Sequence, residues 1–281
     1  MSKTTPTPTI ETVNILYAQV SAEGFGVAEF INAIPVKFSE LSASVKDFAG
    51  ATLRSGFSST SRTNVYHLTR LLERSNYITL SDVEVFVPPG LSVTLYDYVQ
   101  VLKEHSGVLD GILDKVLLPG IRWANSYLRD PSRLVSVRDF YAESGMEKID
   151  IKKAKEDIAR CMSGNQSSDR QIFGKVAKSF KDYSTAVGIL NELVIETESV
   201  SNKNVLEKVD VFANVIDNLS DKVQIGDQRF KFSPAIMTQF ADTIHHVAET
   251  VELYAALVTY IRTAAESVKA TEERLQNILK D

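Results

Sequence analysis

The chain has 281 residues, of which 44% are hydrophobic and 24% are charged, and its formal net charge is −5. This apolar content is ordinary for a globular protein and excludes a wholly disordered chain. The single cysteine, Cys161, excludes an intrachain disulfide and cysteine-rich metal sites. Neither half of the chain has an excess of Lys and Arg, which argues against nucleic acid or an anionic membrane as the partner.

The N-terminal residues MSKTTPTPT contain no apolar stretch of the kind that a signal peptide requires. The longest uncharged run, Val85–Tyr96, is interrupted by Pro88-Pro89-Gly90 and is far shorter than the roughly 18 residues of a membrane helix. We therefore expect a soluble, intracellular protein, located in the cytoplasm or within an assembled particle.

Residues 1–9 are rich in Thr and Pro, which predicts a flexible N-terminal segment. Apolar residues then recur at helical spacing from Ile10, with interruptions at AEGFG (22–26) and at the Ser/Thr-rich stretch 55–64. We expect residues 10–76 to form an N-terminal helical subdomain and residues 77–281 to form the main helical bundle.

Two stretches have the composition of β-strands. Residues 77–95 are rich in β-branched and aromatic side chains and contain the turn Pro88-Pro89-Gly90. Residues 223–232 are similar, with Gly226-Asp227 near the turn of an expected hairpin. Because an isolated hairpin is only marginally stable, we expect the two stretches to share one small antiparallel sheet.

Most of the remaining sequence has the three-to-four spacing of amphipathic helices, including residues 92–128, 168–200 and 205–219. Pro119 lacks a backbone N–H and should bend the first of these helices or break it near Val116. Two small residues in its apolar stripe, Ser106 and Gly120, favour close packing with another helix over a ligand pocket.

The last helix has an N-terminal signature, with Ser233 as a suitable N-cap and Pro234 at the first helical position. Ten of eleven positions at heptad spacing are apolar in the stripe Ile244, Val247, Val251, Tyr254, Val258, Ile261, Ala265, Val268, Glu272, Leu275 and Leu279. A second strip lies beside it, at Leu253, Leu257, Tyr260 and Ala264. One stripe predicts coiled-coil-like packing, and two strips favour a bundle over a two-stranded coil.

These patterns predict an all-α fold, an elongated bundle of long antiparallel helices with a small β-hairpin or sheet element. The residues expected in its core are Trp123, Tyr127, Phe180, Val187, Phe212, Ile216, Val251 and Val258.

The stretch ADTIHHVAET (241–250) is the main candidate for chemistry. Asp242, His245 and Glu249 are spaced so that they share the outer face of the helix, opposite the apolar stripe. The chain has no Glu-x-x-His, which a di-iron bundle needs, and no His-Glu-x-x-His, which a zinc protease needs. We interpret these residues as a solvated polar face, and the histidines at 67 and 105 as single residues that support no site.

Other catalytic templates are also missing from the sequence. FGKVAKS (173–179) lacks the first glycine and the Ser/Thr of a phosphate-binding loop, and no Gly-x-Ser-x-Gly occurs. Cys161 follows a helical pattern and is interpreted as a structural thiol. We therefore assign no catalytic, metal-binding or cofactor-binding residue and expect no cofactor.

The function expected from these patterns is that of a structural or assembly protein, in which helix faces associate with a second copy or another chain. A component of a virion or another large assembly fits this description. The alternative is an enzyme or small-ligand-binding protein with a site between helices. The last helix is longer than the others, so roughly its last ten to fifteen residues are expected to overhang the bundle. We expect residues 262–281 to contact a partner through Val268, Glu272, Leu275 and Leu279; the alternative is that the N-terminal helices cover these side chains.

Overall fold

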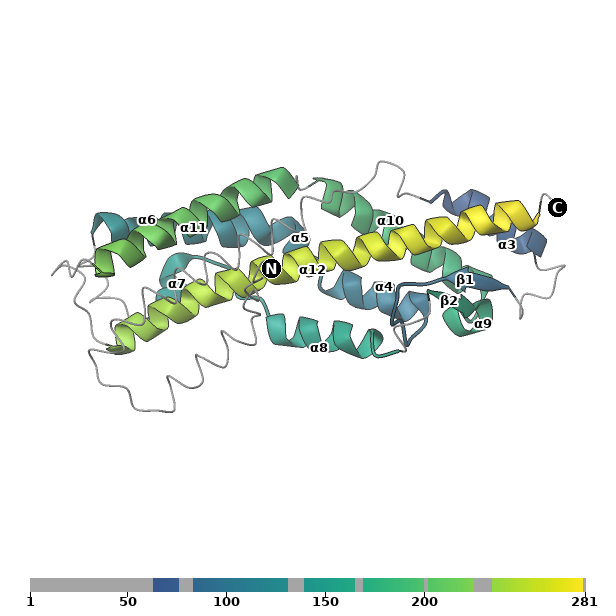
Figure 1. The fold of residues 1–281 in the computed structure, drawn as a ribbon, viewed down its shortest axis with the longest axis horizontal. Helices are drawn as coiled ribbons and strands as arrows, with labels where there is room; N and C mark the ends of the chain where they lie inside the picture. The colour runs from purple at the N-terminus through teal and green to yellow at the C-terminus, as the bar shows by residue number, and fades with distance from the viewer. Residues whose placement is uncertain are drawn as a thin grey trace, which may run out of the picture. The chain divides into compact units, whose positions relative to one another are not determined.

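The computed structural model describes residues 63–75, 83–130, 139–164, 169–199, 202–224 and 234–279 (Figure 1). Helix dominates these residues, and the β structure among them is one two-stranded antiparallel sheet, which confirms the predicted fold class. The chain divides into two compact units. Among the described helices, none has both the length and the apolar character needed to cross a membrane.

The first unit contains the described residues of 112–148 and 203–252. Its elements are the π-helix η2 (Ile112–Leu117), α6 (Leu118–Arg129), α7 (Phe140–Ser144), nearly all of α11 (Asn202–Gln224) and the first part of α12 (Pro234–Ile278). Four aromatic rings from three of these helices form its core, at Trp123, Tyr127, Phe140 and Phe240. Trp123 and Phe240 are closest, with ring centroids 5.0 Å apart.

Gly120 allows close packing between helices, as predicted for this small residue. A Cβ placed on Gly120 would lie 3.2 Å from the Met146 sulfur and 3.4 Å from a ring carbon of Phe212. A larger side chain would push these neighbours away, because protein interiors are close-packed.

The helix is distorted rather than broken near Val116: it continues as the π-helix η2, which ends two residues before Pro119, and the predicted 92–128 helix is instead interrupted by a turn at His105 and Ser106. Pro119 cannot donate a hydrogen bond to the carbonyl four residues earlier, which belongs to Lys115. That carbonyl instead accepts a hydrogen bond from the backbone N–H of Glu147, at 2.9 Å. Because Pro119 has no N–H, the Lys115 carbonyl is left to bind the segment after α7. The Lys115–Glu147 ion pair at 2.8 Å joins the same two residues.

The second unit contains the described residues of 52–111, 149–202 and 253–281. Its elements are α3 (Val65–Ser75), β1 (Glu84–Phe86), α4 (Leu95–Glu104), α5 (Gly107–Gly111), α8 (Ile151–Cys161), β2 (Arg170–Ile172), α9 (Phe173–Val176), α10 (Phe180–Ser199) and the remainder of α12. The α3 helix belongs to this unit, and the rest of the predicted subdomain 10–76 lies almost wholly outside the described residues.

Helix directions in the second unit follow from pairs of side-chain contacts. Thr63 bonds with Asn191, and Thr69 with Ser184, so α3 and α10 are antiparallel as predicted. In contrast, α4 and α10 run in the same direction, because Lys103 lies 3.0 Å from Glu192 and Ser106 contacts Glu196, further along both segments.

The sheet has a different second strand from the one predicted. The β1 strand lies within the predicted stretch 77–95, but its partner is β2, with Val85 opposite Gln171. Residues 223 and 224 are the end of α11, and 225–232 lie outside the described residues. The predicted helix over 168–200 begins only at Phe180, because residues 170–172 extend the β1 ladder, flanked by hydrogen bonds at Val87–Asp169 and Val83–Phe173.

The outer edge of β1 is closed by a side chain of α12. The Thr271 hydroxyl accepts a hydrogen bond from the Phe86 N–H at 2.9 Å and is 3.0 Å from the Ser267 carbonyl, to which it donates. One threonine therefore satisfies a strand donor that would otherwise be unpaired in the interior.

The two apolar strips of α12 are both covered within the chain. From Ile244 to Leu275, every position of the predicted stripe is buried. The second strip is buried at Leu253, Leu257 and Ala264 and half-buried at Tyr260. Of the eight residues predicted for the core, only Phe180 is half-buried and the rest are buried.

Candidate functional site

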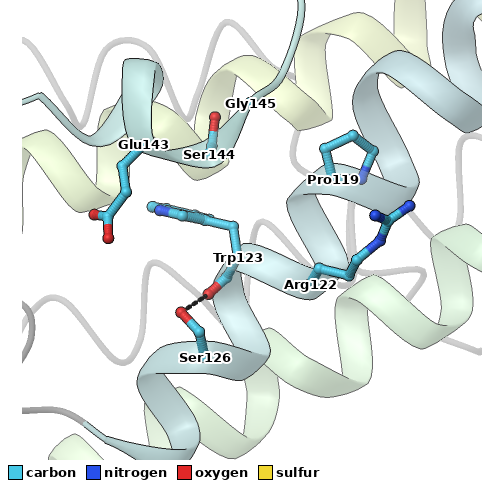
Figure 2. A pocket seen from close by; sticks show the side chains of 7 residues that line it. All are labelled: Pro119, Arg122, Trp123, Ser126, Glu143, Ser144 and Gly145. Carbon is cyan, nitrogen blue, oxygen red and sulfur yellow. Dashed lines mark hydrogen bonds between the residues drawn. The ribbon is translucent and has the colours of Figure 1, made fainter.

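Two hollows lie beside α6 in the first unit, and Figure 2 shows the first of them. The first has a volume of about 350 Å³ and is lined by Pro119, Arg122, Trp123, Ser126, Glu143, Ser144 and Gly145. The second has a volume of about 420 Å³ and is lined by Arg122, Asn125, Ser126, Arg129 and Asp130. Arg122 and Ser126 line both hollows, and we call the two hollows together the α6 trough.

The periodicity of α6 separates a buried face from an exposed one. Gly120, Trp123 and Tyr127 are buried, whereas Arg122 and Arg129 are exposed, seven residues apart on the outer face. Such a spacing places two side chains on the same face about 10 Å apart along the helix.

The opposite wall of the trough is α7, a short helix with defined ends. Asp139 is its N-cap, and this carboxylate accepts hydrogen bonds from the N–H groups of Tyr141 and Ala142. Gly145 ends the helix with φ of 67°, a left-handed conformation that favours glycine. These ends fix Glu143 and Ser144 beside the trough.

Polar groups along the trough differ in their hydrogen-bond and ion-pair partners. Glu143 accepts a hydrogen bond of 2.5 Å from the Tyr127 hydroxyl, and the Ser126 hydroxyl donates to the Trp123 carbonyl at 2.7 Å. No ion pair links Arg122 or Arg129 to another residue in the described part of the chain. The two guanidinium groups are therefore free to bind carboxylates or other anions from outside.

The indole of Trp123 forms the floor of the trough. Its ring is 5% exposed, and in Figure 2 its nitrogen end lies on the Glu143 side. Within the described residues, the Trp123 Nε1 group has no hydrogen-bond acceptor.

The histidines at 245 and 246 are both half-buried, rather than fully solvated as predicted. His245 lies 3.8 Å from Glu249 on the next turn of α12. His246 packs edge-on against the Tyr141 ring, with centroids 4.9 Å apart, and burial lowers the pKa of its imidazole. Packing against α7 accounts for the difference from the prediction. That neither histidine is catalytic stays a prediction.

The residues predicted to contact a partner lie at the end of α12, in the second unit. Val268, Glu272 and Leu275 are no more than 2% exposed, and Leu279 is half-buried. The predicted overhang is therefore wrong for these three residues, because other parts of the unit cover them. Glu272 bonds to His67 of α3 at 3.2 Å and to Lys269 at 2.8 Å. A role for this segment in contacts between chains stays a prediction.

The sequence did not predict the residues that line the trough as a site. The signal for the arginines was their seven-residue spacing opposite the apolar stripe of α6, but such a spacing is common on solvated helix faces. Glu143 and Ser144 gave no signal, because α7 has only five residues and no clear periodicity.

Comparisons of the chain with protein-family models, with curated proteins and with solved structures find no match. The class that the structure defines is a protein of helical units with a small antiparallel sheet. Its function has to be argued from the chain's own surfaces.

Proposed function

We propose that this chain is a structural or assembly protein that associates through the α6 trough, with a second copy of itself or with another chain. The observation that supports this proposal is the pair of exposed arginines, Arg122 and Arg129, which both line the second hollow of the trough. A component of a virion or of another large assembly would use such a face.

The surface that fits the trough carries carboxylates about 10 Å apart, the distance spanned by seven residues of a helix. Arginine binds a carboxylate through two parallel hydrogen bonds, which fixes orientation as well as adding attraction. Asn125 and Ser126, between the two arginines, offer polar groups to the same partner.

A second copy of the chain is the partner that the charge distribution favours. The chain has 36 acidic and 31 basic residues, so the rest of its surface has an acidic excess. The α11 helix, for example, exposes Glu207 and Asp210. Complementary charge speeds association and selects orientation, and salt screens it.

The mass of the native particle, measured by analytical ultracentrifugation over a range of concentrations and salt, tests this proposal. We expect an oligomer that dissociates when Arg122→Glu and Arg129→Glu are combined. The matched control is Arg74→Glu, which reverses an exposed arginine on α3. An oligomer that persists unchanged in the double variant refutes the trough as the interface.

The first hollow also supports a second function, the binding of a small anionic ligand between α6 and α7. Its volume of about 350 Å³ lies within the range of small-molecule sites. The same experiment separates the two functions. A monomer at every concentration, with a small acid bound in native mass spectrometry and lost on Arg122→Glu, would support ligand binding instead.

A further inference from the structure

We propose that the second unit binds a divalent transition-metal ion, with Zn²⁺ as the probe, through Glu104, His105 and Asp157. The ligand atoms of these three side chains all lie within 4.8 Å of one another. This site lies in the unit that does not contain the α6 trough, so it stands independently of the proposed function.

The fold brings these residues together from two helices. The α4 helix ends at Glu104, with His105 as its C-cap, and Asp157 lies on α8, 52 residues later in the chain. The His105 Nε2 and the Asp157 Oδ2 are 3.2 Å apart, and these side chains are only 11% and 16% exposed. A half-buried imidazole and carboxylate thus face each other, with the more exposed Glu104 at the rim.

The spacing of the His105 and Asp157 ligand atoms suits a metal ion. Two atoms that each lie about 2.1 Å from Zn²⁺ are about 3.4 Å apart in a tetrahedral site and about 3.0 Å apart in an octahedral one. The observed 3.2 Å falls between these values, so an ion could join the two atoms with little movement of either helix. Glu104 would supply a third ligand and water a fourth, and imidazole with carboxylates suits Zn²⁺ and neighbouring metals.

Two cations already contact the carboxylates of this site. The Lys153 Nζ is 2.6 Å from the Glu104 Oε1, and the Arg160 guanidinium is 3.4 Å from the Asp157 Oδ1. Lys153 and Glu104 are each 55% exposed, and exposed ion pairs are weak, so a metal ion can displace Lys153 into solvent. Arg160 contacts the oxygen of Asp157 that does not face His105.

Isothermal titration of the full chain with Zn²⁺, in the presence of a reductant, tests the site. We expect one ion per chain, with affinity reduced at least tenfold by His105→Gln and by Asp157→Asn. The matched control is His245→Gln, because His245 also lies near a carboxylate but belongs to no group of three metal-ligating side chains within the described residues. Cys161→Ser is a second control, since this thiol is one turn beyond Asp157 on α8. Both controls should bind as the native chain does.

Two variants at the exposed rim of the site test the proposal even if His105→Gln and Asp157→Asn fold poorly. Glu104→Gln should weaken Zn²⁺ binding, whereas Lys153→Met should strengthen it several-fold, because the lysine no longer competes for Glu104. A purely structural role for the histidine–aspartate pair predicts no gain with Lys153→Met. Absence of saturable binding in the native chain, or binding that is lost only in the His245→Gln or Cys161→Ser variants, overturns the proposal.

Discussion

Two buried tyrosines, Tyr98 in α4 and Tyr127 in α6, should respond in opposite directions when their hydroxyl groups are removed. Both side chains are fully buried. The Tyr98 hydroxyl has no hydrogen-bond partner among the described residues, and burial raises the pKa of this phenol far above its usual value. The Tyr127 hydroxyl donates to the Glu143 carboxylate at 2.5 Å. Each substitution by phenylalanine deletes the same oxygen atom.

The expected magnitudes follow from these environments. A buried polar group without a partner costs roughly 1–3 kcal/mol, and the void left by one oxygen costs roughly 0.5 kcal/mol. Tyr98→Phe should therefore raise the free energy of unfolding by about 0.5–2.5 kcal/mol. A hydrogen bond to a charged group contributes about 1.5–3 kcal/mol, so Tyr127→Phe should lower the free energy of unfolding by that amount.

Urea denaturation followed by far-ultraviolet circular dichroism measures both changes. Fluorescence of Trp123, the single tryptophan, reports separately on the unit that contains Tyr127. If Tyr98→Phe lowers the free energy of unfolding by more than about 1 kcal/mol, the hydroxyl has a partner, such as a buried water, and the reasoning fails.

Three further predictions concern other buried groups. Thr271→Val should destabilise the chain by about 1–3 kcal/mol in urea denaturation, because the Phe86 N–H loses its acceptor, whereas Thr263→Val, which removes only a bond within α12, should have little effect. Burial lowers the pKa of the His246 imidazole below its usual value of about 6.5, so the unfolded state binds a proton at a higher pH than the folded state does. The free energy of unfolding should therefore fall as the pH drops through about 6.5. Glu249, Lys148, His245 and Tyr141 lie around this imidazole. The His246→Gln variant should lose less of its free energy of unfolding between pH 7.5 and about 5.5 than the native chain does. An equal loss in the two proteins would contradict the assignment to His246. Cys161 is 5% exposed and burial raises the pKa of its thiol, so a colorimetric thiol reagent should react far more slowly with native than with urea-unfolded protein.

The sequence was most informative where one local rule determines the structure. The helix beginning at Pro234 and the distortion of the helix before Pro119 both follow from the ring of proline, which fits the first turn of a helix and removes a donor elsewhere. The apolar stripe of α12 is buried from Ile244 to Leu275, because 3.6-residue periodicity marks a packed face, although the last part of the stripe was expected to overhang the bundle.

Features that join distant segments could not be found in the same way. Residues 170–172 form a strand only because Val85 and its neighbours offer them a ladder, and no property of Arg-Gln-Ile by itself requires this. His105 was interpreted as a single histidine, since the carboxylate that faces it is 52 residues away on another helix. Periodicity gives the face of a helix, but it does not give the element that will cover that face.

The same limit applies to the heptad stripe of α12. A stripe of Val, Ile and Leu predicts packing against another helix, and the partner can come from the same chain or from a second one. Burial of one such side chain contributes about 1.5–3 kcal/mol, so a stripe already covered within the chain would have to lose these contacts before it could bind a partner. An association surface is better sought on faces that stay exposed, and on α6 the exposed face carries arginines rather than leucines. An interface of that kind is held by charge, so its strength should fall steeply with salt, whereas pairing of apolar stripes would not be weakened by salt.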